Sequence, residues 1–191
     1  PQGPIVYNDS GEVIPPFAVM KHDSGVTDTA TNDAWIKVKK PDTTFARYLV
    51  NGPEEIAIGG LGRAQDCRYG SLKYDTGTPV KYEGYGPKPG QWTASKGYPC
   101  LGICQEIEYA DAKYMQVEFL PITTLLGKTT GSISAGASTT SYKIYAGTLG
   151  SEADAGWTTV PSVWFRATLG SGKWMKATWI NNGWEGEPLE C

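Results

Sequence analysis

The sequence contains very little histidine, and this scarcity excludes much of the usual catalytic chemistry. Only one of its 191 residues is a histidine, His22, which lies in the segment Lys-His-Asp-Ser-Gly. A serine or cysteine nucleophile normally requires a histidine base that the fold holds beside it. Neighbours in sequence cannot form that arrangement by themselves, so we interpret His22 as a polar residue at a strand end. The chain is therefore predicted not to be an enzyme, and no catalytic residue is assigned.

The sequence also lacks long apolar runs and an excess of positive charge. No run approaches the ~18 apolar residues that a membrane-spanning helix needs. The net charge of -3 at pH 7 gives no electrostatic reason to bind nucleic acid or an anionic membrane. The longest basic cluster, Lys37, Lys39 and Lys40, is typical of the solvated side of a strand. We therefore expect neither nucleic acid nor a membrane as a partner.

The four cysteines do not form the two close pairs that a structural zinc site normally shows. Only Cys100 and Cys104 are near each other, whereas Cys67 and Cys191 are remote from both. We therefore expect no metal ion and no cofactor. The four residues are either free thiols or disulfide candidates, for which three complete pairings are open.

Cys191 is the last residue of the sequence, at the end of the segment 184–191. This segment contains Gly186 and Pro188 and has no strand alternation, so it is predicted to be an extended tail. A tail can reach a neighbour at little entropic cost. This favours a disulfide from Cys191 to another chain over one to Cys67 within its own chain.

Several short motifs match only fragments of known sites. Glu106 and Glu108 point the same way from one predicted strand, as a glycosidase pair could, but such pairs are common on solvated strand faces. The glycine-rich segment 59–62 lacks the lysine of a phosphate loop, and the segment 152–156 has only part of a calcium loop. The segment 8–10 fits the glycosylation acceptor pattern, which is frequent by chance. None of these motifs is assigned a cofactor or metal.

Glycine and proline are abundant, with 24 and 13 residues, and this favours short turns over long helices. Apolar and polar residues alternate with period two, which is typical of half-buried strands, whereas helical periodicity hardly appears. The alternation is clearest over residues 35–39, 103–108, 115–119, 142–145 and 174–179. Residues 110–112 and Asn182-Gly183 are predicted to form hairpin turns. The pattern predicts an all-β fold.

A change in composition near residue 127 predicts how the chain is divided. Residues 127–141 are rich in Gly, Ser and Thr, which indicates either a flexible linker or a weak hairpin. We favour a linker between a small barrel or sandwich at residues 1–126 and a small β module at residues 142–191. So small a module has little interior for its five tryptophans, which are therefore interface candidates. These are Trp157, Trp164, Trp174, Trp179 and Trp184.

The order of several motifs resembles a known class of proteins. The opening NDSGEVIPPFAVMKH at residues 8–22 is followed by YLVNGPEEIAIGGLGRA at 48–64. DTGTPVKYEGYGPKPGQWTASKGYPCLGI follows at 75–103, and the segments 142–157 and 170–180 match the end of the pattern. Together they resemble the accessory structural proteins of tailed-phage particles, over most of the chain.

The resemblance implies a β-rich virion component, such as a decoration, collar, spike or fibre-base protein, that forms a homo-oligomer and contacts other virion proteins. It implies no active-site residue. Cys100 departs from the pattern, in which a glycine is expected, and with Cys104 and Cys191 it suggests a cross-linked variant. Two alternatives stay open. One is a carbohydrate-binding module, as in the part of a spike that touches a cell-surface glycan. The other is a small polysaccharide-cleaving enzyme.

Overall fold

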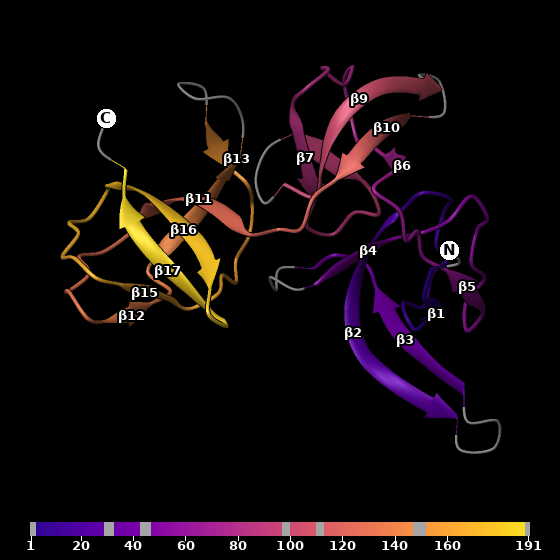
Figure 1. The fold of residues 1–191 in the computed structure, drawn as a ribbon, viewed down its shortest axis with the longest axis horizontal. Helices are drawn as coiled ribbons and strands as arrows, with labels where there is room; N and C mark the ends of the chain where they lie inside the picture. The colour runs from indigo at the N-terminus through magenta and orange to yellow at the C-terminus, as the bar shows by residue number, and fades with distance from the viewer. Residues whose placement is uncertain are drawn as a thin grey trace.

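The computed structural model describes residues 3–28, 33–42, 47–96, 100–109, 113–146 and 152–189. Within these ranges the regular structure consists of β-strands, so the prediction of an all-β fold is confirmed. In chain order the strands are β1 (Ile5–Asn8), β2 (Val19–Asp28), β3 (Asp33–Lys39), β4 (Tyr48–Val50), β5 (Leu61–Arg63), β6 (Tyr69–Lys73), β7 (Gly84–Pro87), β8 (Ala94–Lys96), β9 (Gly102–Tyr109), β10 (Tyr114–Phe119), β11 (Thr124–Thr129), β12 (Ser138–Thr139), β13 (Tyr142–Ala146), β14 (Ala153–Asp154), β15 (Val163–Phe165), β16 (Trp174–Ile180) and β17 (Gly183–Pro188). They form three sheets (Figure 1).

The first sheet has the strand order β4-β2-β3-β1-β5. Its pairs are antiparallel except for β1 with β3, which run parallel. The register between β2 and β3 shifts at Asp23, where the extra residue makes a bulge that bends the strand. Buried apolar residues form a core beneath this sheet, and one of them, Trp92, comes from the loop between β7 and β8. The first sheet therefore depends on a residue supplied by the second.

The second sheet has the order β6-β10-β9-β7-β8 and is antiparallel. The predicted alternation is seen in β10, where Met115 and Val117 are fully buried and Gln116 is exposed. Cys104 on β9 lies opposite Val117 and is fully buried as well. The turn predicted at residues 110–112 lies outside the described residues, although β9 and β10 on either side of it pair as a hairpin would.

The third sheet has the order β12-β15-β17-β16-β11-β13-β14. It includes residues 127–129 in β11 and 138–139 in β12, so the segment predicted as a linker contributes strands to the sheet. Gly127 lies in a tightly packed strand, because a Cβ there would lie only 3.0 Å from the Tyr142 ring and 3.1 Å from the Lys143 carbonyl oxygen. The composition was thus misleading, and the third sheet begins at Thr124.

The chain end also differs from its prediction. Residues 184–188, expected to belong to a tail, lie in β17, which pairs with β16 and β15. Gly186 lies against the buried Phe165 ring, where no Cβ would fit, and this explains the missing alternation. The hairpin into β17 turns at Asn181 and Asn182, whose φ angles of 49° and 66° suit a type I′ turn. The turn therefore lies one residue before the predicted Asn182-Gly183.

A single apolar core connects the third sheet to the other two. Buried residues from β4, β6, β9, β10, β11, β13, β15 and β16 belong to one continuous cluster. Tyr48 of the first sheet contacts Trp157 of the C-terminal region, with ring centroids 6.3 Å apart. The C-terminal segment does not rely on an interior of its own, which explains how it buries large aromatic side chains.

Candidate functional site

A groove of about 990 Å³ lies where the three sheets meet. Its lining comes from residues 47–50, 65–67, 119–123, 161–162 and 182–184, together with Leu101 and Trp179. The size falls within the range typical of ligand sites. No single motif of the sequence supplies this groove, because its walls come from seven separate stretches of the chain.

Trp179 forms the aromatic wall of the groove. It continues the inward-facing row of β16 after Met175 and Ala177, which are fully buried, yet it is 46% exposed. The core ends beneath it, so its ring extends over the groove. Trp184 supports this ring from the paired strand, with centroids 5.5 Å apart and planes at 71°. An edge-to-face contact of this kind holds the Trp179 ring in place while leaving much of its surface accessible.

Polar side chains lie beside the Trp179 ring. Arg47, Asp66, Ser162 and Asn182 line the groove and are exposed. Among the contacts of the described residues, the Arg47, Asp66 and Asn182 side chains have no hydrogen bond or ion pair. The groove therefore combines an apolar platform with donors and acceptors that are available to a ligand.

The other four tryptophans predicted as interface residues lie in different surroundings. Trp157 is 4% exposed and Trp184 is 8% exposed, and both belong to the core, so they are not available to a partner. Trp164 and Trp174 are half-buried, and Trp174 packs edge-to-face against Tyr145 with centroids 4.9 Å apart. Of the five, Trp179 is the one that presents a large exposed surface.

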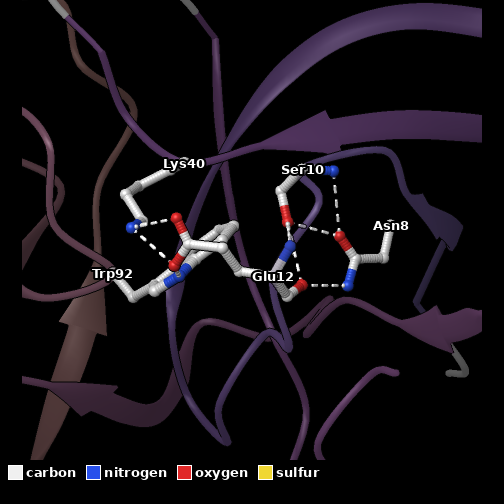
Figure 2. Close-up of polar contacts among 5 residues, drawn as sticks. All are labelled: Asn8, Ser10, Glu12, Lys40 and Trp92. Carbon is white, nitrogen blue, oxygen red and sulfur yellow. Dashed lines mark hydrogen bonds and ion pairs between the residues drawn. The ribbon is translucent and has the colours of Figure 1, made fainter. Parts of the chain in front are cut away.

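A second polar cluster ties the N-terminal loop to the rest of the molecule (Figure 2). Lys40 Nζ lies 2.6 Å from Glu12 Oε1 and 2.7 Å from Oε2, and it lies 5.5 Å from the centre of the Trp92 ring. The indole nitrogen of Trp92 donates to Glu12 Oε2 at 3.3 Å. The hydrogen bond from Lys40 holds the pKa of Glu12 below its ordinary value. The cluster joins three segments that are far apart in sequence. We therefore interpret it as a structural contact and not as a binding site.

Asn8 lies at the buried end of the same cluster and is 1% exposed. Its amide nitrogen donates to the carbonyl oxygens of Glu12, Ile56 and Ala57 at 2.7, 3.0 and 3.0 Å. Its amide oxygen accepts hydrogen bonds from the backbone nitrogen and hydroxyl of Ser10. Although residues 8–10 match the glycosylation pattern, the amide nitrogen is fully engaged, so the folded chain does not present it for glycan attachment.

The remaining candidates are engaged in ordinary surface structure. His22 is a half-buried residue of β2, paired with Val38. Glu106 forms an ion pair with Lys81 at 2.5 Å, which lowers the pKa of Glu106, and nothing is described for the Glu108 side chain. Asp154, in the partial calcium motif, is paired with Lys143 at 2.6 Å. None of these residues lines the groove.

Three of the four cysteines can be placed, and all three are free thiols. Cys67 is exposed at the edge of the groove, Cys100 is half-buried and Cys104 is fully buried. A disulfide among these three, one of the open pairings, is therefore not formed. Cys191 lies outside the described residues, so its disulfide to another chain stays a prediction.

The thiols of these three cysteines should react at very different rates. Burial raises the pKa values of Cys100 and Cys104, which lowers their thiolate fraction, and it also restricts access. We expect iodoacetamide to label Cys67 at least about tenfold faster than Cys100 or Cys104 in the native protein. Peptide mass mapping over time measures each rate, with urea-unfolded protein as the control. Equal rates in the native state would contradict the structure.

The described part of the chain offers neither a membrane-spanning helix nor a cluster of metal ligands. No helix there is long and apolar enough to cross a membrane. No group of three or more His, Cys, Asp or Glu side chains there could hold a metal ion. Comparison with known protein families, curated proteins and solved structures finds no match to this chain.

Proposed function

We propose that this chain is a non-enzymatic structural protein of a tailed-phage particle, acting through contacts with further copies of itself and with other virion proteins. The order of its motifs supports the particle assignment. A projecting two-stranded arm, formed by β2 and β3, supports the role in assembly. The proposed place of action is the virion, outside the host cell.

The arm is the observation that carries this proposal. Near its base β2 pairs with β4 at residues 19–21, and β3 pairs with β1 at residues 36–38. Beyond these positions the two strands pair only with each other, from Val26 with Trp35 outward (Figure 1). This unsupported part comprises three residue pairs, residues 26–28 with 33–35, and because a two-stranded ribbon is marginally stable in water, contact with a neighbour would stabilise it. Trp35, half-buried on this ribbon, is of the residue type most enriched at interface centres.

Assembly through the arm has a direct test in solution. The wild-type protein should have a mass above 20.6 kDa by light scattering and native mass spectrometry, increasing with concentration. Trp35→Ala should raise the dissociation constant at least about tenfold, because truncated tryptophans at interface centres cost the most binding energy. The melting temperature should change little, since Trp35 belongs to neither apolar core.

Tyr69→Ala is the matched control, because Tyr69 is an exposed aromatic residue on the second sheet, away from the arm. It should leave the mass unchanged. A wild-type mass of 20.6 kDa at every concentration contradicts assembly through the arm. The particle assignment has a separate test: peptides of this chain should be detected by mass spectrometry in purified particles of the phage that encodes it, and their absence would refute it.

A further inference from the structure

We infer that the groove at the junction of the three sheets binds a neutral oligosaccharide, with Trp179 as the stacking platform. This inference is independent of assembly through the arm, because the arm and the groove share no residue. It gives the chain a second activity: recognition of a glycan by a particle component.

The position of Trp179 is the first argument. An apolar side chain at the end of an inward-facing row is normally covered, yet this ring is 46% exposed above a recess. Trp184 fixes the ring from behind, so little side-chain entropy is lost when a ligand stacks on it. The C–H face of a pyranose ring is flat and apolar, and it matches such a platform.

The charge of the groove is the second argument. Of the described residues that line it, Arg47 and Asp66 are charged, and their charges cancel. A polyanion such as nucleic acid would require an excess of positive charge. Asn182 and Ser162 add an amide and a hydroxyl, which can both donate and accept hydrogen bonds. An uncharged ligand rich in hydroxyl groups fits this set.

The backbone of the groove distinguishes a glycan from an extended peptide. The Trp179 backbone nitrogen already donates to the Thr123 oxygen, and that of Leu120 to the Leu101 oxygen, both at 2.9 Å. A peptide that adds a strand needs free backbone groups at a sheet edge. These two backbone donors are already engaged within the groove, so recognition beside Trp179 falls to side chains, as it does for sugars.

Titration calorimetry with neutral hexasaccharides tests the inference. The probes are β-1,4-linked glucose, β-1,4-linked N-acetylglucosamine and α-1,6-linked mannose, with a uronic-acid hexamer as the charged comparison. At least one neutral probe should bind better than the charged one. Trp179→Ala should weaken binding at least about tenfold. Asp66→Asn and Asn182→Ala should each weaken it about two- to tenfold.

Two further variants separate binding from folding. Trp179→Tyr keeps an aromatic ring and should restore part of the affinity lost in Trp179→Ala. Tyr82→Ala removes a 77% exposed aromatic residue outside the groove and should leave binding unchanged.

Failure of every neutral probe at millimolar concentration overturns the inference, as does preference for the charged probe. Trp179-dependent binding of proline-rich peptides without any glycan binding would assign the groove to a peptide instead. Trp35→Ala should bind the glycan normally, which separates this outcome from that of the assembly test.

Discussion

Trp92→Ala should lower the free energy of unfolding by about 3–5 kcal/mol, the usual cost of removing a large aromatic residue from a core. For a chain of this length that corresponds to a fall in melting temperature of roughly 6–20 °C. Trp92 is 8% exposed, and its ring fills the core of the first sheet although its backbone belongs to the β7–β8 loop. Urea and thermal unfolding followed by circular dichroism measure the change.

The substitution also tests how the first two sheets are connected. The Trp92 carbonyl oxygen accepts a hydrogen bond from the Val19 nitrogen at 2.9 Å, so ring and backbone both hold the loop against the first sheet. Hydrogen exchange in Trp92→Ala should increase in the β7–β8 loop and in β2 together. Trp92→Phe keeps an aromatic ring but loses the 3.3 Å bond to the exposed Glu12 and part of the buried indole volume, so it should cost less than Trp92→Ala. Wild-type unfolding of Trp92→Ala would show that the loop does not support the first sheet.

The strands were predictable where alternation is local. In β10 and β13 the residues predicted to face inward, such as Met115 and Ile144, are fully buried. Alternation indicates only which side of a strand faces the core. It does not indicate which other strands that strand pairs with in a sheet. The parallel pairs β1 with β3 and β15 with β17 join segments far apart in sequence. For this reason the arrangement of the strands into three sheets was not foreseen.

Glycine caused the main errors at the C-terminal end. Gly127 and Gly186 both lie in strands: the Phe165 ring occupies the space that a Cβ on Gly186 would need, and a Cβ on Gly127 would pack tightly against Tyr142. In a sequence, a glycine required for close packing is indistinguishable from one that makes a flexible linker. Residues 127–141 and 184–188 were therefore predicted as linker and tail.

The groove was only partly predictable. Composition indicated that some tryptophan would be exposed, and Trp179 was among the five named. Arg47 and Asp66 gave no signal, because they lie in irregular segments and become neighbours of Trp179 only when three sheets pack together. Burial of Trp157 and Trp184 could not be foreseen either, since it depends on a core shared with β4 and β10.

Asn8→Asp, at the end of β1, should be a highly damaging change of a single functional group, with a loss of about 3 kcal/mol or more at pH 7. The two side chains have nearly the same shape, so packing is preserved. The difference is electrostatic: the Asn8 amide nitrogen donates to three carbonyl oxygens, and the introduced carboxylate would face those oxygens without a donor. At 1% exposure, water cannot solvate the new charge. Chemical unfolding at pH 7 measures the loss.

The pH dependence separates this electrostatic effect from a simple loss of contacts. Burial beside carbonyl oxygens raises the pKa of the introduced carboxyl group above its unfolded value, near 3.9. The folded variant then binds a proton more readily than the unfolded chain, so the deficit relative to wild type should shrink as pH falls through that folded pKa toward the unfolded value. Once protonated, the group can donate one hydrogen bond again. Asn8→Ala removes the donor without adding a charge, so its deficit, about 1–3 kcal/mol, should stay constant over the same pH range. Unfolding curves for the wild type and both variants, measured between neutral and mildly acidic pH, test this pH dependence. A pH-independent deficit in Asn8→Asp would contradict it. That result would mean that the carboxylate reaches solvent and that the Asn8 site opens in solution.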